Sequence, residues 1–432
     1  MSSETLPVEK AILVGMELKG VKGSWTIEDS MEELGRLADT AGLTVVGATR
    51  QKLSHPDPST WIGSGKVQEL KELLAAEDAR YVVFDDELRP SQQRKLQEAL
   101  GDGIRIIDRT RLILDIFSLH AHSREGKLQV ELAQYQYLLP RLAGLRPGLA
   151  QQVGGTGAGL VGLRGPGETQ LELDRRQARR RIAVLRRGLE EVRTQRFQHR
   201  ARRDQAGIPL AVIVGYTNAG KSSLLNALTG AGVLVEDKLF ATLDPTTRRL
   251  TLPEGREALL TDTVGFIRKL PHDVVAAFRA TLEGVEEADL ILHVVDGSHP
   301  HASEQIAAVE SVLSNLAVAA TPRLVVWNKI DLLPDRILPA ALGSPHASVS
   351  ISAKTGENLG SLLEAVERIL GEALVTVEVL LPYDRYDLVA MLYGQGTVSF
   401  REDTHEGIRL RARVPQALRE RLSAFAPPEA QP

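Results

Sequence analysis

Residues Gly215 to Ser222 have the types and spacing of a phosphate-binding loop, Gly-x-x-x-x-Gly-Lys-Ser. They follow the apolar run LAVIVG and precede the helical pattern SLLNALTG, which is the strand–loop–helix context of this motif. In such a loop, backbone N–H groups surround the phosphates, Lys221 reaches the β- and γ-phosphates, and the Ser222 hydroxyl binds Mg²⁺. We therefore predict a nucleoside triphosphate as substrate and Mg²⁺ as cofactor. The predicted phosphate-binding residues are Gly215, Tyr216, Thr217, Asn218, Ala219, Gly220, Lys221 and Ser222.

A second motif, Asn328-Lys329-Ile330-Asp331, stands at the end of the apolar run RLVVW. A carboxylate at Asp331 can accept hydrogen bonds from N1 and N2 of guanine, and a site built on such bonds rejects analogues that lack the donors. The stem of Lys329 can cover the base. Ser352-Ala353-Lys354 follows the next predicted strand and would place a backbone N–H near guanine O6. The sequence therefore predicts GTP rather than ATP.

Two further segments have the pattern of switch regions that respond to the γ-phosphate. In Asp262-Thr263-Val264-Gly265, Asp262 can hold the Mg²⁺ shell through water and the Gly265 N–H can reach the γ-phosphate. In Phe240-Ala241-Thr242-Leu243-Asp244, we predict that the Thr242 hydroxyl closes on Mg²⁺, with Thr246 and Thr247 as competitors. The predicted catalytic residues are Lys221, Thr242 and Gly265, and the predicted metal ligands are Ser222 and Thr242.

The residue after Gly265 is Phe266, at the place where Ras-like enzymes carry the glutamine that orients the attacking water. The predicted reaction is in-line attack of water on the γ-phosphate, in which positioning and charge neutralisation do most of the catalysis. An apolar ring cannot position water by hydrogen bonding. We therefore expect slow intrinsic hydrolysis, with the missing group supplied by a partner or by a rearranged switch.

The composition of the 432-residue chain is that of a globular protein, with 43% hydrophobic and 25% charged residues and a net charge of −4. It contains no cysteine, which excludes disulfides and thiolate metal sites. It shows neither a signal-peptide pattern nor an apolar stretch that could span a membrane, so we expect a cytoplasmic location. We also expect the protein to be monomeric. The net charge hides one basic block, because residues 175–203 contain twelve arginines and only two acidic residues. Such a block attracts phosphate.

Hydrophobic periodicity divides the chain into four predicted domains. Short β-branched runs alternate with helical patterns over residues 1–115, which favours a small parallel α/β domain. Residues 116–206 are predicted as a helical hairpin linker, 207–371 as the P-loop GTPase domain and 372–432 as a small α+β domain. The predicted fold class is α/β, with the GTPase domain preceded by the parallel α/β domain and the helical hairpin and followed by the α+β domain.

The linker contains a helix with a coiled-coil-like seam, which we expect to pair with a helix of residues 111–141 as an antiparallel hairpin. The seam residues are Leu171, Ala178, Ile182, Leu185, Leu189 and Val192. The arginines of this helix would face outward, either as an RNA-binding surface or as a solvated coiled-coil face. The segment 147–168 between the two helices is rich in glycine and is not expected to form a regular element.

Beyond these motifs, the chain resembles the HflX family of ribosome-associated GTPases from residue 60 to residue 370. The GTPase motifs alone would fit many translational and signalling GTPases. More specific are four segments outside them, and the last of these, followed closely by a P-loop, is the most telling. They are Ile62-Gly-Ser-Gly-Lys66, Asp108-Arg-Thr-Arg-Leu112, SREGKLQVEL at 123–132 and RGPGETQLE at 164–172.

The resemblance implies the same domain order, binding to the large ribosomal subunit and its rRNA, and GTP-dependent splitting or rescue of stalled or idle ribosomes. It also implies stimulation of hydrolysis by that subunit, and an apolar residue at position 266 as a family trait. Some members similarly bind ATP and remodel RNA. In this setting, residues 147–168 either thread between rRNA strands, with Arg164 on phosphate, or form a flexible linker. The alternative of another class is a GTP-gated ribosome assembly or regulatory RNA-binding factor without splitting activity.

Overall fold

The computed structural model describes residues 9–20, 25–142, 170–230, 238–269, 284–316, 318–333, 347–372, 374–414 and 416–426. These residues belong to two compact units. Unit 1 comprises residues 1–192, 238–243 and 269–279, and unit 2 comprises residues 193–237, 244–268 and 280–432. The predicted four-domain division at residues 115, 206 and 371 stays a prediction. The glycine-rich segment 147–168, with Arg164, lies outside the described residues.

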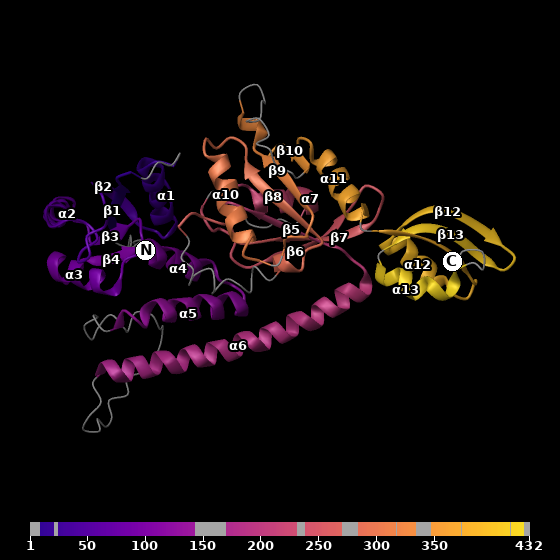
Figure 1. Ribbon diagram of the computed structural model, residues 1–432, viewed down its shortest axis with the longest axis horizontal. Helices are drawn as coiled ribbons and strands as arrows, with labels where there is room; N and C mark the ends of the chain where they lie inside the picture. The colour runs from indigo at the N-terminus through magenta and orange to yellow at the C-terminus, as the bar shows by residue number, and fades with distance from the viewer. Residues whose placement is uncertain are drawn as a thin grey trace, which may run out of the picture. The chain divides into compact units, whose positions relative to one another are not determined.

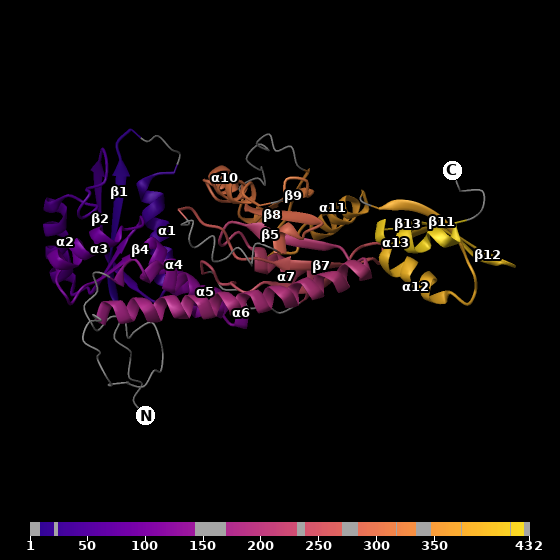
Figure 2. The same ribbon diagram turned by 60° about the horizontal axis from the view of Figure 1, so that its bottom comes forward.

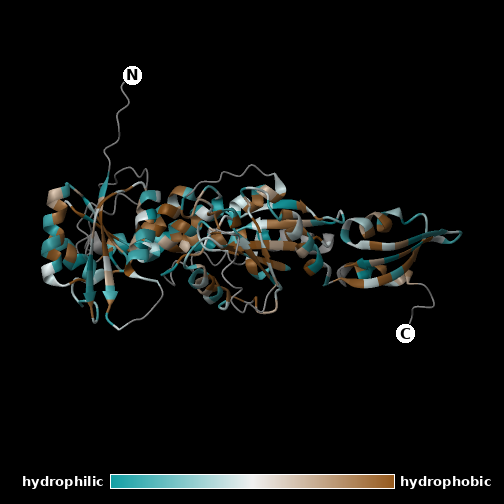
Figure 3. Ribbon diagram, turned by 90° about the horizontal axis from the view of Figure 1, so that it is seen from above, coloured by the Kyte–Doolittle hydropathy of each residue, from teal (hydrophilic) through white to brown (hydrophobic). Residues whose placement is uncertain are grey.

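Unit 1 contains a parallel four-stranded sheet in the order β2-β1-β3-β4, which confirms the predicted α/β fold of the N-terminal part (Figure 1). Ile12 and Val14 of β1 join a core that includes residues of α2 and α3, whereas Gly15 faces Met31 of α1. Figure 3 shows hydrophobic and hydrophilic segments along the same helices, as expected for helices with one buried face. The elements are β1 (Lys10–Leu18), α1 (Ile27–Thr40), β2 (Thr44–Leu53), α2 (Ser64–Glu77), β3 (Tyr81–Phe84), α3 (Pro90–Leu100), β4 (Arg105–Asp108) and α4 (Arg109–His120).

The helical pattern that begins at residue 111 is broken into α4 and α5 (Arg124–Leu138). The break has a local cause: Ala121 is extended, and the Ser123 hydroxyl caps α5 by accepting a hydrogen bond from the Gly126 N–H. Helix α5 pairs with the long helix α6 (Gln170–Ala206), beside which it lies in Figures 1 and 2. Glu131 pairs with Arg181 and Arg124 pairs with Glu191, so the two helices run antiparallel as predicted.

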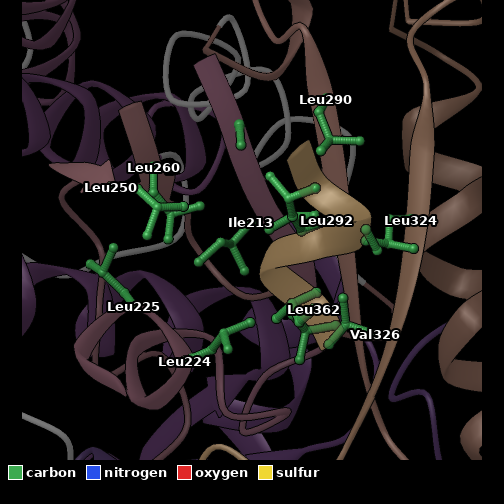
Figure 4. Packing of buried hydrophobic residues seen from close by; sticks show 14 of the residues in the cluster. Ile213, Leu224, Leu225, Leu250, Leu260, Leu290, Leu292, Leu324, Val326 and Leu362 are labelled. Atoms are coloured by element: carbon green, nitrogen blue, oxygen red, sulfur yellow. The ribbon is translucent and has the colours of Figure 1, made fainter. Parts of the chain in front are cut away.

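Unit 2 contains a six-stranded sheet in the order β10-β9-β8-β5-β7-β6, in which only β6 is antiparallel to its neighbour. Ile213 and Leu292 of adjacent central strands pack with Leu224 of α7 and Leu362 of α11 (Figure 4). This buried apolar core fixes the carboxyl ends of the strands, where the predicted site residues lie. The elements are β5 (Leu210–Gly215), α7 (Lys221–Thr229), β6 (Thr246–Thr251), β7 (Glu257–Asp262), β8 (Leu290–Asp296), α10 (Ala302–Leu313), β9 (Arg323–Asn328), η3 (Ile330–Leu332), β10 (Ala347–Ser350) and α11 (Leu359–Glu372).

The C-terminal part of unit 2 has its own antiparallel three-stranded sheet in the order β11-β13-β12, as the predicted α+β domain requires. Ile408 and Leu410 of the central strand are completely buried in a core with Leu388 and Leu392 of α12. Helix-facing and open-facing residues therefore alternate along β13. The elements are β11 (Val375–Leu381), α12 (Tyr386–Gln395), β12 (Thr397–Thr404), β13 (Gly407–Val414) and α13 (Gln416–Leu422). Within the described residues, none of the helices could span a lipid bilayer.

Asp85, directly after β3, is the centre of a buried charge network in unit 1. Its carboxylate accepts hydrogen bonds from Ser30 Oγ at 2.7 Å and Arg109 Nη1 at 2.8 Å, and also from the Lys269 ammonium. Arg109, which is only 1% exposed, pairs with Glu33 as well. Because charges buried this deeply require partners, these contacts tie β3 to α1 and α4.

Replacing Arg109 by alanine is expected to lower the free energy of unfolding by about 3–5 kcal/mol, because Asp85 and Glu33 then stay buried without their main cation. Urea denaturation followed by circular dichroism measures this loss. The matched control is Arg36→Ala, which breaks an exposed ion pair with Glu32 and should cost about 0.5 kcal/mol or less. Equal losses in the two variants would contradict the stabilising role of the network.

Candidate functional site

The predicted P-loop connects β5 to α7, as the motif requires, and two of its glycines are fixed by close contacts. Gly215 has φ +156°, and a Cβ on it would lie 2.2 Å from the Val294 carbonyl oxygen. Gly220 has φ +92°, and a Cβ on it would lie 2.3 Å from Asn328 Nδ2. Both positions therefore exclude any side chain, and the loop closely approaches the neighbouring strand ends.

Lys221 is the first residue of α7 and is 7% exposed. Its Nζ donates a hydrogen bond to the Tyr216 carbonyl oxygen at 2.8 Å, so the side chain curls back over the loop. Burial lowers the pKa of Lys221 to about 8, against the opposing effect of the nearby Asp262 carboxylate. An anion beside Lys221 would raise the pKa of the lysine again, because it favours the charged ammonium.

Ser222 and Asp262 meet where β7 ends beside α7. The Ser222 hydroxyl donates to Asp262 Oδ2 at 2.6 Å. The Asp262 side chain is fully buried, and burial raises the pKa of this carboxyl. Among the residues that the structure describes, its Oδ1 has no hydrogen-bond partner. An unpartnered buried carboxylate oxygen next to a hydroxyl is a suitable environment for a hydrated Mg²⁺, because this ion prefers oxygen ligands and retains several waters. The residues present therefore fit the predicted cofactor.

The predicted base-binding residues form a connected group at the ends of β9 and β10. Asn328 Nδ2 donates to the Ala219 carbonyl oxygen and Asn328 Oδ1 accepts from the Ala353 N–H, both at 2.9 Å. One amide thus joins the P-loop to the segment 352–354. Asp331 Oδ1 accepts from the Ser352 hydroxyl at 2.7 Å, which places that carboxylate beside the same segment. The sequence-predicted base and phosphate residues are therefore brought together in unit 2.

Gly265 lies directly against the P-loop. A Cβ on Gly265 would lie 2.8 Å from Thr217 Cγ2 and 3.0 Å from Lys221 Nζ, so only glycine fits here. The Thr263 hydroxyl donates to the Ile213 carbonyl oxygen at 2.7 Å. Phe266, which is 4% exposed, donates its N–H to the Gly215 carbonyl oxygen and accepts from the Thr217 N–H, at 3.0 and 2.7 Å. The ring of Phe266 is thus buried and offers no hydrogen bond to water.

Segments of the chain match four families, described as "GTP-binding GTPase N-terminal" over residues 28–118, "GTP-binding GTPase Middle Region" over 120–203, "50S ribosome-binding GTPase" over 210–329 and "HflX C-terminal domain" over 340–426. The GTPase HflX of Caldanaerobacter subterraneus subsp. tengcongensis is 49% identical over 417 residues, which cover 96% of this chain and 94% of that protein. The chain belongs to the HflX family of GTPases. The HflX of Escherichia coli K12 is 45% identical over 84% of each chain.

The chain is also similar to a solved structure, that of a GTP-binding protein from the hyperthermophilic archaeon Sulfolobus solfataricus in complex with GDP. It is 26% identical, and the comparison covers 84% of this chain and 99% of that one with a TM-score of 0.43. The family relationship rests on the HflX sequences above, and it confirms the resemblance that the sequence motifs indicated.

The predicted switch segment that contains Thr242 is divided between the two units of the HflX-family chain. Residues 238–243 belong to unit 1 and Asp244 to unit 2. Phe240 is 3% exposed, and its ring meets that of Phe117 in α4 edge-on, with centroids 4.6 Å apart. Lys269, which follows the other switch, also belongs to unit 1 and pairs with Asp86 at 2.7 Å. The role of Thr242 as a magnesium ligand therefore stays a prediction.

Two charged residues that contact or follow the predicted site segments were not identified from the sequence. Asp296, the last residue of β8, pairs with Lys329 Nζ at 2.7 Å and so positions the lysine predicted to cover the base. Its place at the end of a buried strand was an available signal. Lys269 pairs with acidic residues of unit 1 that are far away in sequence. No local pattern identifies such a pair.

Proposed function

We propose that this HflX-family protein hydrolyses GTP at the P-loop site, binds the large ribosomal subunit in its GTP-bound state, and thereby splits or rescues stalled or idle ribosomes. The observation that carries the proposal is the convergence, around Asn328, of the P-loop with the strand ends that carry Asp331 and Ala353. The family match described as "50S ribosome-binding GTPase" over residues 210–329 supports the ribosomal partner.

In the proposed site, Gly215 to Ser222 surround the phosphates and Lys221 neutralises their charge. Ser222 and Thr242 would ligate Mg²⁺, and Asp262 would hold its water shell. A bound Mg²⁺ would supply positive charge to the phosphate oxygens. The Gly265 N–H contacts the γ-phosphate. Asp331 accepts from guanine N1 and N2, Lys329 covers the base, and the backbone of Ser352, Ala353 and Lys354 meets O6. The remaining proposed contacts come from Phe240, Ala241, Leu243, Asp244, Thr263, Val264, Asn328 and Ile330.

The intrinsic rate of hydrolysis is proposed to be low and to rise when the large subunit binds. Phe266 supports this view, since its ring is buried and its backbone is hydrogen-bonded to the P-loop. It cannot orient the attacking water in the way that a glutamine does. A group of the ribosome, or a switch rearranged by the ribosome, would then complete the site.

The arginines of α6 are proposed to contact rRNA phosphate. Ala178, Ile182 and Leu185 are buried, and the last two pack in a cluster with Leu132 of α5, so the seam of α6 is occupied by its partner helix. Most of the arginines between the seam positions are exposed, as at Arg179 and Arg186. Guanidinium groups bind phosphate in a bidentate manner, which favours RNA as the ligand of this face. We place the protein in the cytoplasm, where ribosomes are found, and propose that it acts as a monomer.

The test is to mix intact ribosomes with the protein and a non-hydrolysable GTP analogue, and to follow light scattering and sedimentation. We expect dissociation into subunits, with the protein sedimenting with the large subunit, and no effect with GDP or with the Lys221→Ala variant. Phosphate release from the same mixtures with GTP should exceed that of the protein alone. Stable binding to large subunits without dissociation would instead identify an assembly or regulatory factor.

A further inference from the structure

The C-terminal part of unit 2 exposes three tyrosines. Tyr383, Tyr386 and Tyr393 have 52%, 58% and 48% of their surface exposed. They are three of the seven tyrosines of the chain, and the other four are buried or half-buried. Large exposed aromatic side chains are concentrated here rather than spread over the described residues.

These tyrosines share one surface with Arg401 of β12. Tyr386 and Tyr393 are seven residues apart and therefore lie on the same face of α12. Arg401 pairs with Asp403 at 3.1 Å and also bonds to the hydroxyls of Tyr393 and Tyr386, contacts that raise the pKa of the arginine. The Tyr383 hydroxyl donates to the Thr404 carbonyl oxygen at 2.7 Å. We call Tyr383, Tyr386, Tyr393 and Arg401 the tyrosine surface.

The tyrosine surface is on the helix-covered side of the C-terminal sheet. Arg401 stands opposite Leu410 in the β12–β13 ladder, and Leu410 is buried in the core beneath α12. The neighbouring Phe400 stands opposite Arg411 and so faces the open side, where it is 47% exposed. Phe400 is therefore an exposed aromatic residue of the same strand that lies outside the tyrosine surface.

The charges around the tyrosine surface are already balanced. Arg401 pairs with Asp403, and the nearby Arg385 pairs with Asp387 at 2.9 Å. Residues 375–425 contain seven arginines, no lysine and seven acidic residues, so their net charge is zero. RNA binding draws its affinity from cations that neutralise phosphates. Balanced guanidinium groups among exposed tyrosines are instead the composition found at the centre of protein–protein interfaces.

We propose that the tyrosine surface binds a protein of the large ribosomal subunit rather than its RNA. The tyrosine rings would pack on apolar side chains of that protein, and their hydroxyls, with Arg401, would supply the directional hydrogen bonds. The inference rests on the proposed ribosomal function. Two parts of the protein would then bind different components of the large subunit. The arginines of α6 would contact rRNA phosphate, and the tyrosine surface would contact a ribosomal protein.

The test compares the variant Tyr386→Ala/Tyr393→Ala with Phe400→Ala and the unaltered protein. Affinity for purified large subunits is measured with a non-hydrolysable GTP analogue at several salt concentrations. We expect the double variant to bind about tenfold or more weakly, as truncation of central interface tyrosines does. The slope of the logarithm of the binding constant against the logarithm of the salt concentration should stay unchanged, because no phosphate contact is lost. Phe400→Ala should bind normally, and all proteins should keep the same GDP affinity and circular dichroism spectrum.

Undiminished binding of the double variant, a flattened salt slope, or an equal loss in Phe400→Ala would each overturn the assignment. A photoreactive benzophenone side chain at position 393 provides a second measurement. The component of the large subunit that is crosslinked to position 393 should be digested by protease and not by ribonuclease. Digestion by ribonuclease and not by protease would show that the tyrosine surface contacts RNA. Failure of the unaltered protein to bind large subunits would refute the proposed function itself. This result is distinguishable from a failure of the tyrosine-surface assignment, in which the unaltered protein still binds.

Discussion

Replacing Lys221 by alanine is expected to abolish the binding of GTP and GDP. The lysine ammonium is buried, hydrogen-bonded to the Tyr216 carbonyl oxygen and close to Gly265. Because residues 215–222 contain no other cationic side chain, its loss would leave the phosphates without a positive charge from this loop. Truncating one partner of a buried, hydrogen-bonded charge pair costs about 2–5 kcal/mol or more, which corresponds to at least about thirtyfold in affinity. Competition with a fluorescent guanine nucleotide measures the change.

The control for this variant is Lys66→Ala. Lys66 also follows a glycine at the start of a helix, in the sequence Gly63-Ser-Gly-Lys66, but it pairs with Glu69 at 2.7 Å. We expect its replacement to leave guanine nucleotide affinity unchanged. GTP affinity that survives in Lys221→Ala would show that the phosphates bind elsewhere.

Replacing Asp331 by asparagine is expected to transfer base preference from guanine to xanthine. A carboxylate accepts from two guanine donors, whereas a carboxamide presents a donor in place of one acceptor, which suits the extra carbonyl of xanthine. Since Asp331 Oδ1 already accepts from the Ser352 hydroxyl at 2.7 Å, the amide oxygen can keep that bond and preserve the orientation of the side chain. Sites of this kind discriminate by about 10⁴-fold. We expect GTP affinity to fall and XTP affinity to rise, as measured by competition.

The matched control is Asp296→Asn, a second strand-end carboxylate beside Lys329. This variant should lower the affinities for GTP and XTP in the same proportion. It disturbs Lys329, which is predicted to cover the base, without changing the acceptors that are predicted to bind the base. If Asp331→Asn also lowered the affinities for GTP and XTP by the same factor, Asp331 would be a positioning residue, and another group would recognise the base.

Local patterns predicted much of the fold and which elements carry the residues of the candidate site. The run LAVIVG, the glycine spacing and the helix that begins at Lys221 specify a strand, a loop and a helix, and the structure has β5 and α7 at those places. Likewise the seam of α6 predicted an antiparallel partner, which the Glu131–Arg181 and Arg124–Glu191 pairs together confirm. The break after His120 was missed, because its cause is a single capping serine inside an otherwise helical pattern.

The contacts that local patterns could not predict join distant segments. Phe240 packs on Phe117, and Lys269 reaches Asp85 and Asp86, across more than a hundred residues in each case. The sequence shows no periodicity or spacing that indicates these contacts, because each depends on how elements distant in the chain pack together. The same holds for Asn328, whose motif indicated a base-binding strand end but not the hydrogen bond from its amide to Ala219.

The amide of Asn328 holds both the P-loop and the segment at Ala353, each at 2.9 Å. The amide of Asn328 therefore fixes the span between the P-loop and the segment at Ala353. A ligand that matches this span loses little free energy in ordering the two parts. In the proposed site, we expect this fixed span to select for the distance between the phosphates and the base of a nucleotide, in addition to the base itself.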